Sequence, residues 1–543
     1  MITISQEKRH RVRRTMVNHV DIKFSEIENL MKARMKSFDR ANFKSYSDQS
    51  TESTKELAYK FVQEYLQCST IHGVKYLGKL RIKPSIVGRL FWALIMICSF
   101  LFLAWMLSRF WARYTANPTR TVIESFQTPI YMIPFPAITL CPLVAPLAKT
   151  RMKLLKRLRL PDNMDNDTAN FLLRYGPSWA NEHSPAGKDY VNNLEELLDI
   201  NHMTFMDFLK FLRPCEDLFD SCSWNGETKN CSELFKVSYT FTGICCSFNY
   251  LLEDYIKTGR KKNDSDIVRT DLYGPKSGLR IVLHPDLLAH IDNTAIRFST
   301  NSIGVVMFPH HPLEYVGTIA VRQILQAEQE LWISVTPLVK SFKTIEHSHQ
   351  DDAGDLVLHC ADETFKLKYF PTYQYTNCFI SCAIRAVVQL CGCVPYYYAP
   401  VADMYSLRIC GWEDWQCLYT NADEIRIIQN VKTENFSCEC INPCLNVFYD
   451  IQTLSSVLNG QQDFNVSPVY KNLSKSQAVL RVYLSSETFT VMHTIPLADR
   501  LYLLASVGGI FSLFVGCSFI SSIEILYFIG LFLRSYSSSK KTK

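Results

Sequence analysis

The stretch GGIFSLFVGCSFISSIEILYFIGLFL, residues 508–533, is apolar enough to cross a lipid bilayer, yet it carries groups that could bind an ion. Gly516-Cys517-Ser518 offers a glycine that can relax a helix, which would free backbone carbonyls and a serine hydroxyl as hard-oxygen ligands for a cation. Glu524 follows six residues after Ser518 and would attract cations and repel anions. Helix packing is the alternative interpretation, with small residues allowing close contact and Glu524 reaching the cytosolic surface.

Two apolar segments could place these groups in a membrane. Residues 86–107 contain one charge, Arg89, and residues 501–533 include the stretch above. Both exceed the roughly 20 residues that a transmembrane helix needs. The domains expected are a cytosolic N-terminal region 1–85, a transmembrane helix 86–110, an extracellular domain 111–500, a second transmembrane helix 501–533 and a cytosolic tail 534–543.

The charge distribution predicts that both termini lie in the cytosol. Residues 1–85 hold 17 Lys and Arg against 9 Asp and Glu, and residues 534–543 hold four basic residues and no acidic one. The whole chain has a net charge of +6, so residues 86–533 are net negative. Basic flanks remain cytosolic, which would leave roughly 390 residues outside the cell. The basic opening EKRHRVRR is interpreted as a solvated or lipid-facing arm, not as a nucleic-acid site.

The cysteines agree with this topology. Of 19 cysteines, 16 lie between the two apolar segments, and an even number in an oxidising compartment indicates disulfides. Zinc binding by Cys391-x-Cys393 and Cys438-x-Cys440 is the alternative, which an oxidising exterior disfavours. Six N-glycosylation sequons lie in the same region, at Asn166, Asn230, Asn263, Asn435, Asn465 and Asn472.

The spacing of apolar residues predicts the elements of this outer region. Helical spacing occurs in residues 151–160, 193–212 and 378–391, and in the last of these Cys378 and Cys382 lie one turn apart, as suits parallel disulfide rungs. The prolines of residues 126–142 predict extended chain. Strands are expected at 278–285, 302–308, 330–339 and 478–491, and the last of these leads almost directly into the second apolar segment.

Enzyme chemistry has no support in the sequence, because HExxH, GxSxG and phosphate-binding glycine loops are all missing from it. Two histidine-containing clusters, at 309–312 and 346–352, could bind a metal ion or sense protons. Solvated loops are the interpretation favoured for both.

These pieces together resemble the degenerin/epithelial sodium channel superfamily, in its insect pickpocket branch, from about residue 72 to residue 533. The resemblance is carried by motifs in the family's order: His72-Gly73 before the first span, Arg89-x-x-Trp92 at its start, FPAITLCP at 135–142 with Pro142 in place of the usual Asn, the cysteine array from Cys378, and Gly516-Cys517-Ser518 as the G/S-x-S filter followed by Glu524.

The resemblance implies an α+β membrane protein with two transmembrane helices and a large disulfide-rich extracellular domain of palm, β-ball, finger, thumb and knuckle. Two helices per chain cannot enclose a hydrated path, so a pore needs several subunits around an axis. The resemblance implies that this assembly is a trimer. The implied function is a plasma-membrane sodium channel subunit that is amiloride-sensitive and gated by an extracellular stimulus. Its partners would be Na⁺, related subunits, the bilayer and an extracellular ligand, with no nucleic acid, cofactor or resident metal.

The resemblance also assigns residues. Gly516, Cys517 and Ser518 would form the selectivity filter, Glu524 would attract cations, and Ala505, His72 and Gly73 would act in gating. The implied disulfides are Cys141–Cys245, Cys222–Cys231, Cys215–Cys246, Cys360–Cys444, Cys378–Cys440, Cys382–Cys438, Cys391–Cys417 and Cys393–Cys410.

Three departures from the family pattern qualify these implications. Ser506 stands where many members have an acidic or amide residue, and Ile510 replaces a residue that is commonly polar. Residues 348–360 lack the aromatic loop of acid-sensing members, which argues against proton gating. The rival functions are a non-conducting accessory or receptor subunit, an ATP-gated trimeric channel, which lacks these motifs, and, more remotely, an ectoenzyme.

Overall fold

The structure is a computed structural model of the 543-residue chain, and it describes residues 54–77, 86–116, 119–179, 188–259, 266–289, 304–317, 320–342, 360–361, 365–422, 425, 438, 440–458, 470, 473–474, 476–496 and 500–541. The chain forms two compact units. The terminal unit consists of Met1–Pro118 and Leu497–Lys543, and the central unit of Thr119–Pro496.

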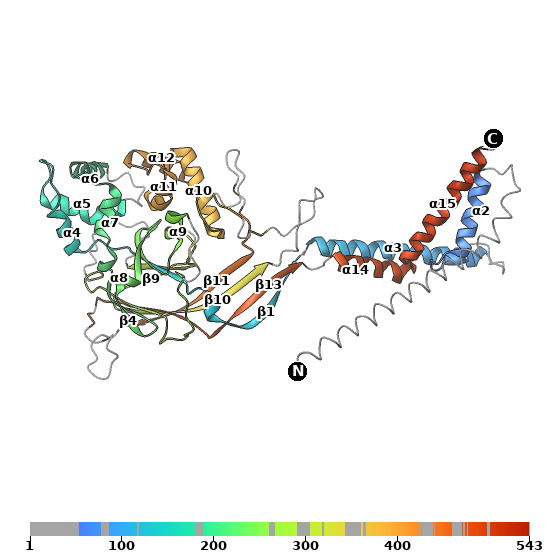
Figure 1. The fold of residues 1–543 in the computed structure, drawn as a ribbon, viewed down its shortest axis with the longest axis horizontal. Helices are drawn as coiled ribbons and strands as arrows, with labels where there is room; N and C mark the ends of the chain where they lie inside the picture. The colour runs from blue at the N-terminus through green and yellow to red at the C-terminus, as the bar shows by residue number, and fades with distance from the viewer. Residues whose placement is uncertain are drawn as a thin grey trace, which may run out of the picture. The chain divides into compact units, whose positions relative to one another are not determined.

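The central unit is built on two sheets (Figure 1). The larger has the strand order β1-β13-β10-β12-β7-β3-β4, with β11 also paired to β10, and the smaller has the order β5-β6-β2-β8-β9. The strands are β1 Thr119–Pro129, β2 Ala137–Pro142, β3 Phe219–Trp224, β4 Glu227–Lys229, β5 Phe235–Thr240, β6 Gly243–Phe248, β7 Leu279–Leu283, β8 Val305–His310, β9 Gln323–Leu325, β10 Gln329–Phe342, β11 Leu445–Val457, β12 Val479–Leu484 and β13 Thr488–Pro496.

Hydrophobic alternation explains how the large sheet is covered. Along β10, buried residues alternate with partly exposed ones, so that one face, with Leu331 and Ile333, meets the core. The same core contains Ile138 of β2 and Met307 of β8, so the two sheets share it. The strands expected at 278–285, 302–308 and 330–339 therefore correspond to β7, β8 and β10.

Two expected segments are each divided in the structure. Residues 193–212 form two helices instead of one, because the chain turns through His202, at a φ of 50°, and the Thr204 hydroxyl accepts the Asp207 N–H to cap the second helix. The strand expected at 478–491 is β12 followed by β13, both parallel to β10. Leu484 pairs with Val335 and Thr490 pairs with Leu338, so five residues on this side face only two on β10, and the excess forms the connection between β12 and β13.

Two groups of helices lie along one side of the sheets of the central unit (Figure 1). The first group packs around fully buried Leu172, Leu194 and Phe208, and the second is built on the long helix α10. The helices are α4 Ala148–Leu155, α5 Asn166–Trp179, α6 Lys188–Ile200, α7 Phe205–Leu212, α8 Cys231–Leu234, α9 Leu252–Thr258, α10 Tyr375–Cys391, α11 Ala399–Tyr405 and α12 Trp415–Thr420, with 3₁₀ turns η2 Ile130–Met132, η4 Cys215–Asp217, η6 Tyr396–Tyr398 and η7 Trp412–Asp414.

The expectation of a solvated loop at residues 309–312 is wrong. His310 ends β8 and is only 5% exposed, and its Nε2 lies 2.8 Å from the Thr139 hydroxyl. Its Nδ1 lies 2.9 Å from the His311 carbonyl, which fixes Nδ1 as the protonated nitrogen. Burial lowers the pKa of His310 to about 4, so the ring is neutral at physiological pH. The second cluster, 346–352, lies outside the described residues.

The terminal unit contains α2 Thr54–Cys68, η1 Val74–Leu77, α3 Ile86–Ala116, α14 Arg500–Val515 and α15 Phe519–Lys541. Among the described residues, α3 alone is long and apolar enough to cross a membrane as a single helix, and α14 with α15 would be a second crossing if the bent pair is one span. The helix α3 extends six residues beyond the expected boundary at residue 110. Figure 1 shows α14 beside α3 and α2 beside α15.

Candidate functional site

The residues that sequence analysis singled out for ion binding lie at a break in the C-terminal apolar segment. The helix α14 ends at Val515, α15 begins at Phe519, and the axes of the two differ by 71°. Gly516 permits the break because its φ is +66°, which other residues adopt at a cost. Gly516, Cys517 and Ser518 are therefore the three residues outside helical geometry in this segment.

The segment that precedes the first apolar helix packs directly on this break. The His72 N–H donates to the Val515 carbonyl at 3.1 Å, which satisfies an acceptor that the end of α14 leaves open. A Cβ placed on Gly516 would overlap His72 Nδ1. The contact therefore requires glycine at position 516, for its conformation and for the space that His72 occupies.

A second contact joins the same two segments through Thr70 and side chains near the start of α15. The Thr70 hydroxyl donates to Glu524 Oε2 at 2.8 Å, and the Thr70 N–H donates to the same oxygen at 3.2 Å. The Thr70 hydroxyl also lies 2.8 Å from that of Ser521, which is 1% exposed. Glu524 is thus held by the chain itself, a role that differs from both sequence-based interpretations, cation attraction and a side chain that reaches the cytosolic surface.

Two serine hydroxyls accept hydrogen bonds from backbone N–H groups at the start of α15. The Ser521 hydroxyl accepts the Ser518 N–H at 3.1 Å, and the Ser518 hydroxyl accepts the Ser521 N–H at 3.3 Å. This reciprocal arrangement caps α15 as side-chain caps do elsewhere. Because Ser518 and Ser521 use their hydroxyls in this way, the break is a built feature of the segment and not a frayed helix end.

The turn at residues 70–77, between α2 and α3 and called the pre-span turn below, is fixed on α3 as well as on the break. Gly73 has a φ of +84°, and a Cβ there would lie 2.7 Å from Met96 Sδ. Tyr76 of η1 stacks on Trp92 of α3 with 4.3 Å between ring centroids. The sequence motifs include Trp92, but none of them includes Thr70. The only sequence signal for Thr70 is a hydroxyl residue two positions before His72. That signal indicates a role only when the structure places Glu524 beside it.

Ala505, the other residue assigned to gating, is not part of this contact network. It is exposed on α14, before the break, as are Gly508 and Gly509, which have no neighbouring atom within 4 Å of an added Cβ in the described chain. Further along, α15 contacts α2 through two ring pairs, Phe61 with Phe532 at 5.6 Å and Tyr65 with Phe528 at 5.4 Å.

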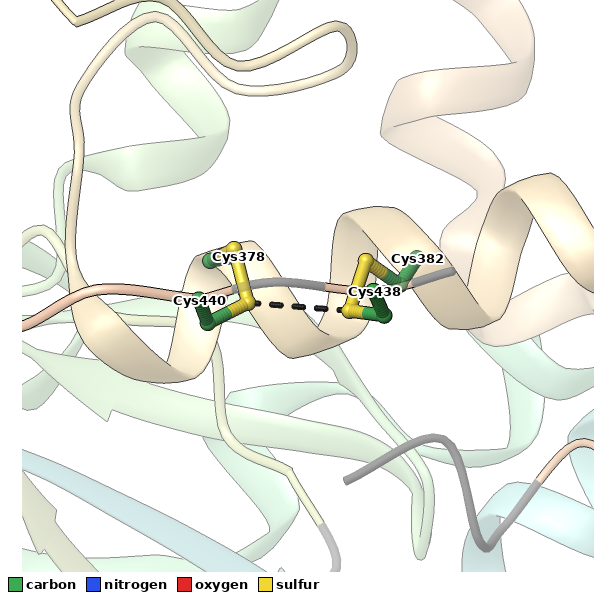
Figure 2. A group of neighbouring side chains, drawn as sticks. All are labelled: Cys378, Cys382, Cys438 and Cys440. Carbon is green, nitrogen blue, oxygen red and sulfur yellow. Dashed lines mark hydrogen bonds between the residues drawn. A yellow bond between two sulfur atoms is a disulfide. The ribbon is translucent and has the colours of Figure 1, made fainter. Parts of the chain in front are cut away.

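Eight disulfides brace the central unit, and they join the same cysteines that the family resemblance pairs. Two of them form neighbouring rungs between α10 and the chain near Cys438, and Figure 2 shows both rungs on one side of the helix. The sulfurs of Cys438 and Cys440 lie 3.7 Å apart. All four sulfurs are bonded in pairs, so they are not thiolates available to zinc. The pairs are Cys141–Cys245, Cys215–Cys246, Cys222–Cys231, Cys360–Cys444, Cys378–Cys440, Cys382–Cys438, Cys391–Cys417 and Cys393–Cys410.

Two of the six sequon asparagines lie in the described chain, and both are on the surface of the central unit. Asn166 is exposed at the start of α5. Asn230 is exposed at the N-cap of α8, where its side-chain oxygen accepts the Ser232 N–H at 3.2 Å. The remaining sequons, Asn263, Asn435, Asn465 and Asn472, lie outside the described residues.

Comparison with known proteins places this arrangement in a family. A profile described as "Amiloride-sensitive sodium channel" matches residues 65–528, most of the chain. The chain is similar to Sodium channel protein Nach of Drosophila melanogaster, at 26% identity over 486 residues, 87% of each chain. It is similar to Pickpocket protein 28 of the same species, at 24% over 532 residues, 91% of this chain and 82% of the relative. The Bile acid-sensitive ion channel of Mus musculus shares 24% over 490 residues, 87% of this chain and 88% of the relative.

The matched region begins before the pre-span turn and ends beyond Glu524, so it includes every contact described at the break. Relatives named as sodium channels and as pickpocket proteins cover the chain almost from end to end. The chain therefore belongs to the amiloride-sensitive sodium channel family, on its insect pickpocket-like side, and its relatives there are ion channels and not enzymes.

Proposed function

We propose that the chain is a subunit of a trimeric, amiloride-sensitive channel that passes Na⁺ across the plasma membrane. The observation that carries the proposal is the break at Gly516–Ser518 inside an apolar segment. Backbone polar groups outside helical geometry are tolerated at membrane depth only where protein buries them or where they line a hydrated path. One chain supplies a single break, so a path lined on all sides needs copies arranged around an axis.

In this proposal Gly516, Cys517 and Ser518 form the selectivity filter, and the pre-span turn holds it in shape. The His72 N–H anchors Val515, while Thr70 anchors Glu524 and Ser521. Glu524 contributes negative charge below the filter, which favours cations over anions. A displacement of Thr70 or His72 would alter the break directly, so both are placed to act in gating together with Gly73.

The proposed route for an extracellular stimulus follows the chain connections. The helix α3 ends at Ala116 and β1 begins at Thr119, while β13 ends at Pro496 and α14 begins at Arg500. Strands β1 and β13 are paired along their length, so both apolar segments lead from one ladder. Movement of the disulfide-braced α10 region would reach α14 and Ala505 through this ladder. Both termini are cytosolic in the proposal, and Thr119–Pro496 is extracellular.

The test is a glycine pair within the same segment. Gly516→Ala should abolish Na⁺ current in voltage-clamped cells, because the added Cβ would overlap His72. Gly530→Ala is the matched control, since a Cβ at Gly530 of α15 meets no described atom within 4 Å. Surface labelling must show equal amounts of both variants. Loss of current in both, or in neither, would remove the filter assignment.

An accessory, non-conducting subunit is the second candidate. The observation in its favour is Ser506 on α14, a neutral residue where many family members carry an acidic or amide side chain, which weakens attraction of cations toward the filter. The same recordings decide between the two. Amiloride-blocked Na⁺ current from this chain alone supports the pore-forming role, whereas current only after co-expression with a related subunit, unchanged by Gly516→Ala, supports the accessory role.

A further inference from the structure

A pair of arginines lies on the face of the large sheet that points away from the core. Arg280 of β7 is directly opposite Arg481 of β12 in an antiparallel pair. Their chain neighbours Leu279, Ile281, Leu480 and Val482 are fully buried in the core, so the two arginines project from the other face. Side chains directly opposite each other in such a pair are separated by about 5 Å at Cβ, and like charges there are destabilising.

Arg481 is fully committed to groups of its own chain. Its Nε donates to Glu330 Oε1 at 2.9 Å, and another of its nitrogens donates to the Tyr470 hydroxyl, which itself contacts Glu330. Its guanidinium lies 4.5 Å from the centre of the Trp332 ring. Glu330 and Arg481 both have side chains that are 13% exposed. Arg481 is therefore a fixed cation neutralised by one carboxylate.

Arg280 has no such arrangement. Among the residues that the structure describes, its guanidinium has no hydrogen-bond acceptor and no ion-pair partner, although the side chain is partly buried. Burial, and next the charge of Arg481, lower the pKa of Arg280. Among the described residues, Glu330 is the one carboxylate that acts on both arginines, so the described groups leave one positive charge uncompensated here. A guanidinium has five N–H donors, and leaving them unmet in a partly desolvated place is costly.

The residues next to Arg280 extend the same site with hydroxyl groups. Ser223 of β3 is opposite Arg280, and Thr228 of β4 is opposite Ser223. Paired positions share a face, so the order across four strands is two guanidiniums followed by two hydroxyls. In the described chain Glu330 bonds to Arg481 and no acceptor bonds to the Arg280 guanidinium, and such a combination of free donors is typical of a site for a carboxylate or another small anion.

We propose that Arg280, with Arg481 and Ser223 beside it, binds a monovalent anion of the carboxylate or halide class. The anion neutralises the positive charge that Glu330 does not compensate, and it bridges Arg280 of β7 and Arg481 of β12. Two sources can supply it: a small anion of the extracellular solution, or the carboxylate of an acidic side chain on a neighbouring copy of the chain. The second source rests on the proposed assembly of several copies, whereas the first does not.

The experiment uses the full-length protein in lipid nanodiscs and measures thermal unfolding, not current, so that it is independent of channel activity. Chloride and, separately, formate are titrated against the weakly coordinating sulfonate isethionate at constant ionic strength. The variant is Arg280→Gln. The matched control is Arg322→Gln, which removes an arginine that is exposed elsewhere on the central unit. The distribution of assembled sizes is measured on the same samples.

If the anion comes from solution, chloride or formate raises the unfolding midpoint of the unmodified chain and of Arg322→Gln by at least about 2 °C. Arg280→Gln then shows no such rise, and in isethionate it is more stable than the unmodified chain because the like-charge pair is gone. If the anion is a neighbouring carboxylate, the midpoint does not depend on added anions, and Arg280→Gln loses assembled copies while Arg322→Gln keeps them.

The proposal is overturned if Arg280→Gln equals the unmodified chain in stability and in assembly under every condition. Arg280→Lys guards against a neutral variant that fails to fold, because it keeps the charge without the planar fork. It should retain a weakened response to added anion, or most of the assembly. An anion site here is also excluded if added anion raises the unfolding midpoints of Arg280→Gln, Arg280→Lys and Arg322→Gln by the same amount.

Discussion

At the scale of single residues, the break in the apolar segment depends on what surrounds it more than on its own three residues. Gly516 is required because His72 fills the space of a side chain. Ser518 and Ser521 cap α15 with their hydroxyls. Glu524 accepts two hydrogen bonds from Thr70, and a charge-assisted bond of this kind contributes about 1.5–3 kcal/mol. The carboxylate that suggested an ion path therefore also positions the turn that supports it.

Cys517 provides a direct probe of whether the break faces water. It is a free, partly exposed cysteine between the two helices. In a background with Cys68→Ser and Cys98→Ser, which removes the other free thiols of the described chain, we expect a cationic methanethiosulfonate reagent to reduce Na⁺ current by more than about half, because it places a fixed positive charge in the path. Adding Cys517→Ser should abolish the effect. Equal inhibition with and without Cys517 would contradict a water-facing filter.

At the scale of elements, the sequence pattern predicted the two apolar segments, several helices and the strands β7, β8, β10, β12 and β13, and it failed where contacts outside the segment decide. The period-2 pattern of β10 and the helical spacing of 378–391 are intrinsic to their segments, so both were predictable. The polar cluster at 309–312 was not, because His310 is stabilised in the core by Thr139, a residue far away in the sequence. Nor could the pattern show that residues 193–212 turn at His202.

The two disulfide rungs of α10 give a prediction about non-additive stability. Cys382–Cys438 spans 56 residues and Cys378–Cys440 spans 62, so each closes nearly the same loop. Removing one rung as a serine pair should cost only about 2–3 kcal/mol, because the other rung still closes the loop, whereas removing both should cost about 6–7 kcal/mol.

The check is thermal unfolding of three full-length variants: one without Cys378–Cys440, one without Cys382–Cys438 and one without both. We expect the fall in midpoint for the quadruple serine variant to exceed the sum of the two single-rung falls. The serine pair at Cys222–Cys231, whose loop spans 9 residues and which lies apart from the rungs, is the control and should add to either rung's effect without excess. Strict additivity of the two α10 rungs would show that they do not share one loop constraint.

The buried carboxyl of Glu253 on α9 makes the stability of the fold fall as pH rises, whereas the buried His310 and His311 make it fall as pH decreases. Burial raises the pKa of Glu253 to about 8, and its side chain accepts the Tyr239 N–H at 2.8 Å. The folded chain then holds this proton to a higher pH than the unfolded chain does. The contribution of Glu253 is therefore fully present below about pH 4.5 and is lost as pH rises toward about 8.

Glu253→Gln should remove this loss while keeping the oxygen that Tyr239 needs. We expect the unfolding midpoint of Glu253→Gln to exceed that of the unmodified chain at pH 9, with the difference shrinking as pH falls to 5. His310 and His311, whose pKa values burial lowers to about 4, destabilise both proteins equally as pH falls below about 6.5, so their effect cancels in the difference. A pH-independent difference would mean that Glu253 is ionised in the fold.

At the scale of the whole molecule, the charge, cysteine and sequon patterns could be interpreted from sequence because each reflects the compartment and not the fold. The eight cysteine pairs could not be derived in this way, since spacing leaves many connectivities open. They followed from the family resemblance, and the structure contains the same eight. The contact of the pre-span turn with the break joins Thr70 to Glu524, 454 residues apart, which no local pattern can indicate.

The proposed orientation, with both ends cytosolic, makes a prediction about glycans and terminal tags. Asn166 and Asn230 are exposed on the central unit, so a glycosidase that removes N-linked glycans should shift the mobility of the full-length protein from cells. Asn166→Gln and Asn230→Gln should each reduce that shift by one glycan, because both side chains are accessible to the transferase only if Thr119–Pro496 enters the secretory lumen.

Tags at the N-terminus and after Lys543 should bind antibody only in permeabilised cells, since the basic residues beside both apolar segments favour the cytosol. An N-terminal tag that is accessible on intact cells would place the pre-span turn outside and separate it from the negative cytosolic leaflet. That result would contradict the gating role proposed for His72 on the cytosolic side, even if the contact with Gly516 is correct.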